Sequence, residues 1–252
     1  MFTAIILRSG MEAHWRDGLN VKSYVDQFAR EIFARLLDNY GPQGWWPGAS
    51  NQFQVCLGAI LVQHTSWRNV EKALLSLSRG GIWSTQALHM VDINELEELV
   101  HSAGTYRVKA RTLKDFAKYL SENYNLELDE FLAQPLPNLR NELLGIRGIG
   151  KETADVIALY AGGYASFVID SYTKRVFRRL SQDRHDLPYD NWQRVFTDGI
   201  SADAQMFNEY HALLVRLAKD VCVLRSPRCL ACCVRDMCMS AGMDDDMARI
   251  SG

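Results

Sequence analysis

Apolar residues recur at helical spacing along almost the whole sequence, and this periodicity constrains the fold more than any other feature. Side chains three and four residues apart share one face of an α-helix, whereas those of a strand alternate between two faces. One face of a first helix is formed by Phe28, Ile32, Phe33, Leu36 and Leu37. Gly41-Pro42 should end that helix. The sequence has no convincing strand run, internal repeat or low-complexity tract, so an all-α protein is expected.

Helix boundaries follow from capping signals and from the ends of the apolar pattern. Asp92 and Glu95 have the spacing of a capping box before an apolar run, which Gly104 should stop. Further helices are predicted over residues 52–62, 68–77, 107–119, 139–144, 152–161, 171–180, 192–200 and 205–219. The cysteine-rich segment after them should form a distinct appendage.

Cysteine usage distinguishes a metal or cluster site from a disulfide framework. Five of the six cysteines fall between Cys222 and Cys238. They are too close together for disulfides to cross-link a chain of 252 residues. Four thiolates can surround one Zn²⁺ or hold a [4Fe–4S] cluster. Zinc ribbons tend to carry two Cys-x-x-Cys pairs, whereas one pair lies here between two single cysteines, which favours a cluster. The predicted ligands are Cys222, Cys229, Cys232 and Cys238, with Cys56 as a core residue. Cys233, beside Cys232, is either a spare thiol or an alternative ligand in a shifted register.

A glycine-rich turn precedes the helix predicted over residues 152–161; its sequence is Leu144-Gly145-Ile146-Arg147-Gly148-Ile149-Gly150-Lys151. Glycines permit a tight turn whose backbone N–H groups, with the N-terminus of the next helix, can bind a phosphate. Such a hairpin between two helices would grip a nucleic-acid backbone whatever its sequence. An ordinary connection between helices has the same pattern and stays open as the alternative.

Asp170 ends an aliphatic run, Val168-Ile169. Burial of a carboxylate is costly unless the group caps a helix or takes part in chemistry. Asp170 is therefore predicted as the N-cap of the helix over residues 171–180. A catalytic role is compatible with that cap.

The Gly148-Ile149-Gly150 turn with Thr153-Ala154, the Val168-Ile169-Asp170 run and the four-cysteine string together resemble the endonuclease III superfamily of DNA glycosylases, the helix-hairpin-helix group with an essential Asp. The resemblance covers about Val21 to Ser240. It implies a two-lobed all-α fold. A six-helix barrel would span residues 50–162, and a second lobe with a [4Fe–4S] cluster would combine residues 21–49 and 163–240. Residues 1–20 and 241–252 would be tails, the second one acidic. The resemblance further implies a monomer that binds double-stranded DNA containing a damaged base, in the groove between the lobes.

Glu152 departs from the bifunctional members of that superfamily, which place a nucleophilic Lys two residues after the second hairpin glycine. Lys151 is the neighbouring residue but points about 100° away around the helix. Without an amine at this place no Schiff base can start strand cleavage. The resemblance therefore implies a monofunctional glycosylase of base excision repair, with Asp170 as its catalytic carboxylate and weak or absent AP lyase activity. A favourable charge at the helix N-terminus is the simpler role of Glu152.

Three stretches are similar to the 3-methyladenine glycosylase branch of the superfamily: Trp45-Trp46-Pro47, Gly58 to Trp67 and Gly148 to Asp155. That branch surrounds the base with aromatic side chains, so the resemblance implies a base pocket formed by Trp45, Trp46, Pro47, Trp67 and, by position, Glu152. A cationic alkylpurine is electron-poor and should stack on Trp faces. Its charge already activates the glycosidic bond, so no acid is needed. Packing between the lobes is the alternative role of the two tryptophans.

An enzyme that acts on a base in duplex DNA must extrude the base and fill the gap. By family position Gln63 is the plug, and Thr105, before Tyr106, lies on the opposing wedge loop. A polar helix end is the alternative role of Gln63, and His64 is expected as a partly exposed residue at a helix terminus. The other DNA contacts expected are Gly148, Gly150, Lys151, Arg225 and Arg228.

The formal charge of −2 does not exclude a nucleic-acid partner, because the basic residues are clustered. Residues 107–118 hold five basic residues and one acidic residue, and residues 174–184 repeat that ratio. Both runs could line a DNA-facing side, with weak and salt-sensitive non-specific binding. No stretch approaches the ~18 apolar residues of a membrane span, so a soluble, cytoplasmic protein with no membrane partner is expected.

Three other functions stay open. Removal of uracil or thymine from mismatches also needs no Lys. A catalytically silent iron–sulfur protein that binds DNA or senses redox state would fit the cysteines and the hairpin. A zinc-stabilised binding module would use the same four thiolates.

Overall fold

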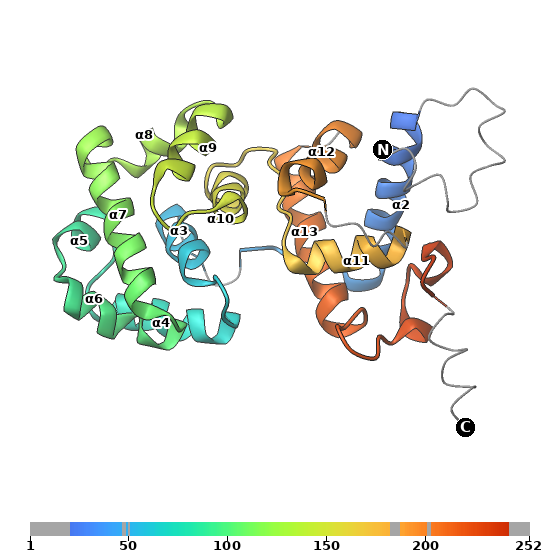
Figure 1. The fold of residues 1–252 in the computed structure, drawn as a ribbon, viewed down its shortest axis with the longest axis horizontal. Helices are drawn as coiled ribbons and strands as arrows, with labels where there is room; N and C mark the ends of the chain where they lie inside the picture. The colour runs from blue at the N-terminus through green and yellow to red at the C-terminus, as the bar shows by residue number, and fades with distance from the viewer. Residues whose placement is uncertain (1–20, 47–48, 50, 182–186, 201–202, 242–252) are drawn as a thin grey trace. The chain divides into compact units, whose positions relative to one another are not determined.

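The computed structural model of the protein describes residues 21–46, 49, 51–181, 187–200 and 203–241, which form helices joined by turns (Figure 1). No strand occurs among these residues, so the all-α fold class is confirmed. The predicted N-terminal tail, residues 242–252 and Pro47 lie outside them. Within the described helices, none is long and apolar enough to cross a membrane. The chain divides into two compact units, residues 46–166 and residues 1–45 with 167–252.

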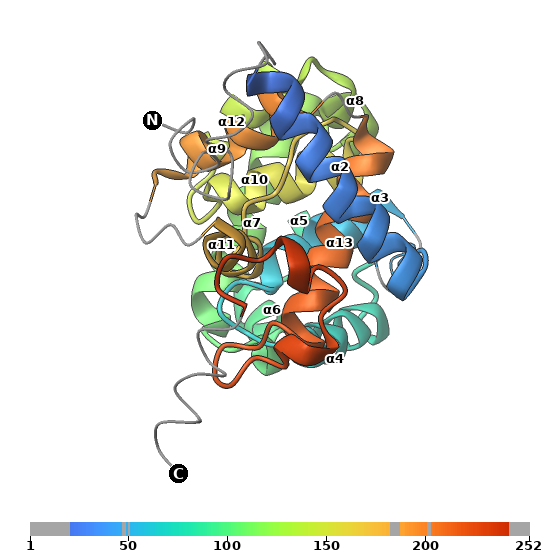
Figure 2. The same ribbon diagram turned by 90° about the vertical axis from the view of Figure 1, so that its right-hand side faces the viewer.

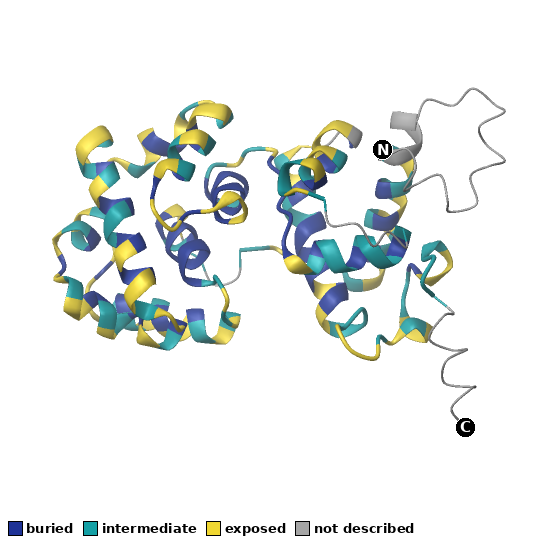
Figure 3. Cartoon of the chain, viewed as in Figure 1, coloured by how far each residue is buried: buried dark blue, intermediate teal, exposed yellow. Residues whose placement is uncertain are grey.

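The unit of residues 46–166 is built around a nearly all-apolar helix. Its helices are α3 (Gln52–Leu61), α4 (Trp67–Arg79), α5 (Thr85–Met90), α6 (Ile93–Leu99), α7 (Tyr106–Tyr124), α8 (Leu128–Ala133), α9 (Leu136–Gly145) and α10 (Lys151–Val156). Eight of the ten α3 residues are buried, and Figure 3 shows α3 and α10 mostly in the colour of buried residues. A helix that is apolar on all sides must be surrounded, and α4, α7 and α10 pack against α3. Asn51 caps it by accepting the N–H of Gln54 at 3.0 Å.

The capping signals around α6 are confirmed. The Asp92 carboxylate accepts the N–H of Asn94 at 2.8 Å and begins α6. After a 3-10 turn at His101–Ala103, Gly104 has a φ of +67° and ends the run. Glycine is the residue that adopts this left-handed backbone without steric cost. The chain then enters α7, which packs against α5, α6 and α8.

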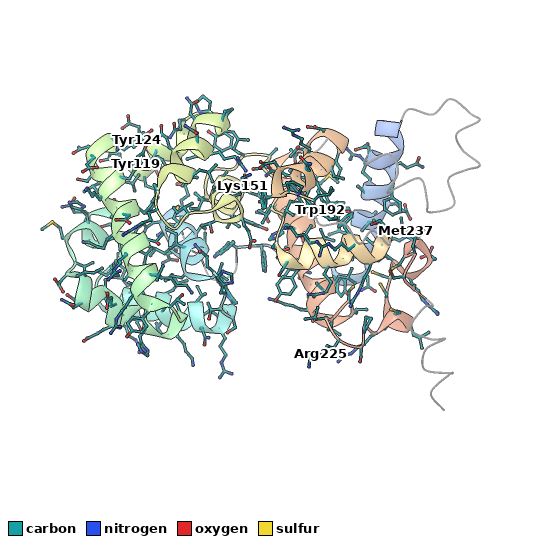
Figure 4. All side chains as sticks on the ribbon, viewed as in Figure 1. Tyr119, Tyr124, Lys151, Trp192, Arg225 and Met237 are labelled. Carbon is teal, nitrogen blue, oxygen red and sulfur yellow. The ribbon has the colours of Figure 1, made fainter. Side chains whose placement is uncertain are left out.

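Helix α8 is stabilised by aromatic contacts with α7, because it is too short to be stable alone. Phe131 of α8 makes edge-to-face contacts with Phe116, Tyr119 and Tyr124 of α7, with centroid distances of 6.1, 6.1 and 5.2 Å. The Tyr124 hydroxyl donates to Glu142 of α9 at 2.6 Å, and Figure 4 labels both tyrosines at this end of α7. Side-chain packing from its neighbours therefore stabilises a helix of six residues that would be marginal alone.

Helix α10 does not continue as a regular helix. It passes into a π-helical turn at Ile157–Ala161, in which the N–H of Gly162 donates to Ile157 O at 2.9 Å. The helix predicted over residues 152–161 is therefore α10 followed by this turn. A π turn is wider than an α turn and shifts the direction of the side chains that follow.

The other unit contains α2 (Val21–Tyr40), α11 (Ser171–Ser181), α12 (Tyr189–Gly199) and α13 (Ala204–Asp220), followed by 3-10 turns at Cys229–Ala231 and Arg235–Met237. Helix α13 packs against α11 and α2, and Figure 2 shows α2 beside α13. An aromatic core joins them: the Phe167 ring stacks on Phe196 at 3.9 Å, and Tyr210 packs edge-on to Phe167 at 5.7 Å. The predicted stop of α2 is confirmed, because Gly41 adopts a φ of +69° directly after Tyr40.

Candidate functional site

Asp170 is the N-terminal capping group of α11. Its Oδ1 accepts the backbone N–H of Thr173 at 2.7 Å, and the residue is 8 % exposed. The predicted cap is therefore confirmed, and it leaves Oδ2 for another partner.

That partner is His211 of α13, which the sequence pattern did not identify. Its Nε2 lies 3.6 Å from Asp170 Oδ2, and His211 is 4 % exposed. Burial alone would raise the pKa of Asp170. The electrostatic attraction of the nearby His211 and the N–H of Thr173 outweigh burial and lower that pKa below its usual value. Asp170 is thus ionised at neutral pH although it is buried.

The two adjacent tryptophans contact different residues. The Trp45 ring packs against His211, with centroids 5.8 Å apart and planes at 62°. Trp46 instead packs edge-on to Trp67 at 5.2 Å and to Tyr160, in the π turn, at 5.1 Å. The structure therefore brings Trp46 and Trp67 together, as the predicted pocket requires, and places Trp45 against His211.

A small residue on α3 allows the contact of Trp46. A Cβ atom on Gly58 would lie 3.0 Å from Trp46 Nε1, so the indole rests directly on the helix backbone. Tyr160 was missed by the sequence reasoning, because the π turn breaks the spacing from which its direction would be inferred.

The glycine-rich turn is a helix-hairpin-helix. It joins α9 to α10, and the N–H of Ile149 donates to Ile146 O at 3.1 Å. Gly148 has a φ of +88°. Gly150 is the N-cap of α10 in an extended conformation, and no side chain caps this helix end. Backbone N–H groups at an end without a side-chain cap are suited to an anion.

Lys151 and Glu152 are the first two residues of α10, and both side chains are exposed. Figure 4 labels Lys151 beside the hairpin. Glu152 lies in the first turn, where a negative charge is favourable. The simpler role predicted for Glu152 therefore agrees with its position.

The predicted plug and wedge residues both lie in exposed or half-exposed turns of the 46–166 unit. Gln63 follows α3 and donates its amide to Gly148 O at 3.1 Å, so it touches the hairpin. Thr105 is exposed with a φ of +40° directly before α7. A threonine in that conformation is strained. His64 is exposed after the end of α3, as expected.

The basic run over residues 107–118 is not wholly a surface for DNA, and that expectation is corrected. Lys109 is 4 % exposed and donates to Ala103 O at 2.6 Å. Burial lowers the pKa of Lys109. Lys114 donates to the carbonyl groups that end α5, at Leu88, His89 and Val91. These two amines are used as internal donors because their stems are buried along α7.

Two arginines of the second basic run are likewise turned toward the cysteine segment. Arg175 donates to the carbonyls of Cys222 and Ala218 at 2.9 and 2.8 Å. Arg179 donates to Val223 O at 2.7 Å and lies 3.3 Å from the Cys222 sulfur. Both side chains therefore fix the path of the chain after α13.

The four predicted cluster ligands are half-buried thiols. Burial and, to a lesser extent, the charges of Cys233, Cys222 and Cys238 raise the pKa of Cys232 to about 11. Burial also raises the pKa of Cys238, as do the charges of Cys222 and Cys229. The four thiols therefore share one electrostatic neighbourhood. Within the described ranges, no three His, Cys, Asp or Glu side chains are arranged to hold a single metal ion.

The loop that carries the cysteines is tied to α2 and is basic at its surface. Arg35 Nη1 donates to both carboxylate oxygens of Asp236, at 2.6 and 2.7 Å. Arg225, labelled in Figure 4, and Arg228 are exposed. Leu224 and Leu230 are also exposed.

Comparison with known proteins agrees with this arrangement. Residues 57–200 match the family described as HhH-GPD superfamily base excision DNA repair protein. A protein of Methanocaldococcus jannaschii, provisionally named DNA repair glycosylase MJ1434, is 41 % identical over 83 % of this chain and 95 % of its own length. The structure of an endonuclease III–DNA complex is similar over 88 % of this chain and 98 % of that chain, with a TM-score of 0.75 at 22 % identity.

A second solved structure supports the closer resemblance inferred from the sequence. It is the Helicobacter pylori 3-methyladenine DNA glycosylase bound to 1,N6-ethenoadenine, with a TM-score of 0.66 and 26 % identity over 77 % of this chain and 97 % of that chain. The expected resemblance to the endonuclease III superfamily, with a branch like the 3-methyladenine glycosylases, is confirmed. The chain belongs to the HhH-GPD superfamily of base excision DNA repair proteins.

Proposed function

We propose that this DNA glycosylase is monofunctional and removes an alkylated purine such as 3-methyladenine from duplex DNA by hydrolysis. The observation that carries the proposal is Asp170, a buried carboxylate that stays ionised at the start of α11. A buried carboxylate held in its charged form is typical of a reacting group. Family membership supplies the reaction class.

In the proposed mechanism, Asp170 acts on the sugar of the extruded nucleotide. As the glycosidic bond lengthens, positive charge develops on the sugar, as in other glycoside hydrolyses. The ionised Oδ2 stabilises that charge and accepts a proton from the attacking water. Oδ1 remains bound to the Thr173 N–H, so one of the two carboxylate oxygens stays in place throughout.

The proposed absence of strand cleavage is argued from Glu152. Glu152 is exposed, and by the family resemblance it would stand where bifunctional relatives carry the amine that attacks the sugar. A carboxylate cannot form a Schiff base, so the product would be an intact abasic site. The proposal therefore expects cleavage only after alkali.

Three aromatic residues support an alkylated purine as the substrate. Trp46, Trp67 and Tyr160 pack together, and their rings offer the faces on which an electron-poor base would stack.

DNA would be held through its phosphates by the hairpin and by the cysteine loop. Lys151 and the backbone of Gly148 and Gly150 would bind one phosphate, and Arg225 and Arg228 would bind others. Phosphate contacts release counterions, so affinity should fall steeply as salt rises.

We include in the proposal a [4Fe–4S] cluster that the four cysteines would hold. The support is the shared neighbourhood of the thiols and the donation of Arg179 toward Cys222. When bound, the cluster would supply a cross-link that fixes the basic loop. Brown protein with iron and sulfide would support this assignment, and colourless protein with stoichiometric zinc would contradict it.

The decisive test uses the purified protein on duplexes that each hold one lesion: 3-methyladenine, 7-methylguanine, hypoxanthine, uracil or a thymine mismatch. Release of the methylated purines, with strand breaks only after alkali, is the expected result. Breaks without alkali would contradict the monofunctional mechanism. Release of only uracil or thymine would establish the mismatch alternative, and native activity in Asp170→Asn would refute the catalytic role.

A further inference from the structure

The two carboxylate oxygens of Asp170 face donors from different helices. Oδ1 receives the N–H of Thr173 from α11 at 2.7 Å, and Oδ2 faces His211 Nε2 from α13 at 3.6 Å. A cap through one oxygen leaves the second oxygen some freedom to move. A donor on the second oxygen removes that freedom.

The imidazole of His211 is itself restrained. The residue is 4 % exposed, and the Trp45 ring packs against it at 5.8 Å. Helix α13 is anchored on both sides, by α2 and by α11. Nε2 is therefore held at a fixed place opposite Oδ2.

We propose that His211 is a positioning residue for Asp170, and that Trp45 acts through His211 rather than on the base. The Nε2–H group of His211 orients Oδ2 toward the sugar and keeps the carboxylate charged. The proposal rests on the proposed function, in which Asp170 is the catalytic carboxylate. A distance of 3.6 Å needs only a small movement to become a hydrogen bond, and such bonds often tighten when substrate binds.

Electrostatics explains why the residue at position 211 must offer a hydrogen-bond donor to Asp170 Oδ2. A side chain of the same size without a donor would not be enough. Burial disfavours the charged form of a carboxyl group. Without His211, burial would be opposed by Thr173, and the protonated, inactive form of Asp170 would gain. An apolar residue of similar volume would preserve packing but not this effect.

Four variants test the proposal on a duplex with one 7-methylguanine. His211→Phe keeps a ring but removes the donor, and His211→Gln places an amide nitrogen near the position of Nε2. Asp170→Asn reports the proposed function, and Trp45→Leu removes the ring that restrains His211. For each variant we would measure the single-turnover rate constant, the Kd for a duplex holding a tetrahydrofuran abasic-site analogue, and the midpoint of thermal unfolding.

The expected result is a rate loss of about 10- to 100-fold for His211→Phe, since partners that orient a reacting group typically have effects of this size. His211→Gln should stay within about threefold of the native rate, Trp45→Leu should fall between the two, and Kd should change by less than about twofold in all of them. Equal losses in both His211 variants, or a native rate in His211→Phe, would overturn the positioning role. If Asp170→Asn also kept the native rate, the proposed function would fail as well. If His211→Phe does not fold, His211→Gln and Trp45→Leu still separate the outcomes.

Discussion

Gly148 of the hairpin lies directly against Thr112 of α7. A Cβ atom at Gly148 would stand 2.1 Å from Thr112 Oγ1, and the glycine has a φ of +88°. Two independent reasons therefore require glycine here, one steric and one conformational.

Gly148→Ala should lower the free energy of unfolding by about 3 kcal/mol, because it adds a clash to a left-handed backbone. Urea unfolding would measure the loss. Thr112→Ala in the same chain should recover part of it by removing the clash. Gly145→Ala is the matched control: a Cβ there meets nothing within 4 Å, and alanine in a helix should be neutral or stabilising by up to about 1 kcal/mol. Equal losses at both glycines would contradict the contact with Thr112.

Arg140 and Asp155 form an ion pair that joins α9 to α10. Arg140 Nε and Nη2 donate to Asp155 at 2.9 and 3.3 Å, and Ser166 Oγ donates to the same carboxylate at 2.7 Å. Asp155 is fully buried. Arg140→Ala should cost about 3 kcal/mol, since it leaves a buried charge without its cation. Ser166→Ala should cost about 1 kcal/mol, as one hydrogen bond is lost. The ranking would be wrong if chemical denaturation showed the serine variant to be the less stable.

The lowered pKa of Asp170 fixes a pH window for stability. A carboxyl group with a lower pKa in the folded protein contributes stability above its unfolded pKa of about 3.9 and loses it as pH falls through the folded value. The native protein should therefore exceed Asp170→Asn in unfolding free energy by a constant amount from about pH 7 to pH 5. The difference should shrink only below about pH 4. A decline that begins near neutral pH would show that the Asp170 pKa is not lowered.

Glu152→Lys should introduce a Schiff base. The substitution places an amine on the exposed first turn of α10. Borohydride treatment during turnover should then trap a covalent protein–DNA complex that the native protein does not form. Lys151→Ala in the same chain should leave trapping intact. Trapping by the native protein would instead assign the amine to another residue.

Most helix positions could be predicted because buried apolar residues recur at helical spacing within a helix. The helices predicted over residues 52–62, 68–77 and 171–180 occur as α3, α4 and α11 with shifts of at most two residues at either end. Helices α5 and α8 were missed, because six residues are too few to show a period. Their stability comes from packing by α7.

The candidate site was predictable only in its local parts. The cap by Asp170 and the hairpin glycines depend on neighbouring residues, which a sequence pattern records. The pairing of His211 with Asp170 joins positions 41 residues apart. His211 is one of many buried residues on α13, so the spacing gives no sign that its partner is a carboxylate.

The π turn after α10 is equivalent to a single-residue insertion into a helix. Removal of one residue from Ile157–Ala161 would restore an ordinary α-helix and turn Tyr160 away from Trp46. The packing of Trp46, Trp67 and Tyr160 therefore depends on the number of residues in this turn and not only on residue identity. A homologue with an unbroken helix at this place would need a different residue to meet the same tryptophan, so alignments across this segment should be built with a gap allowed there.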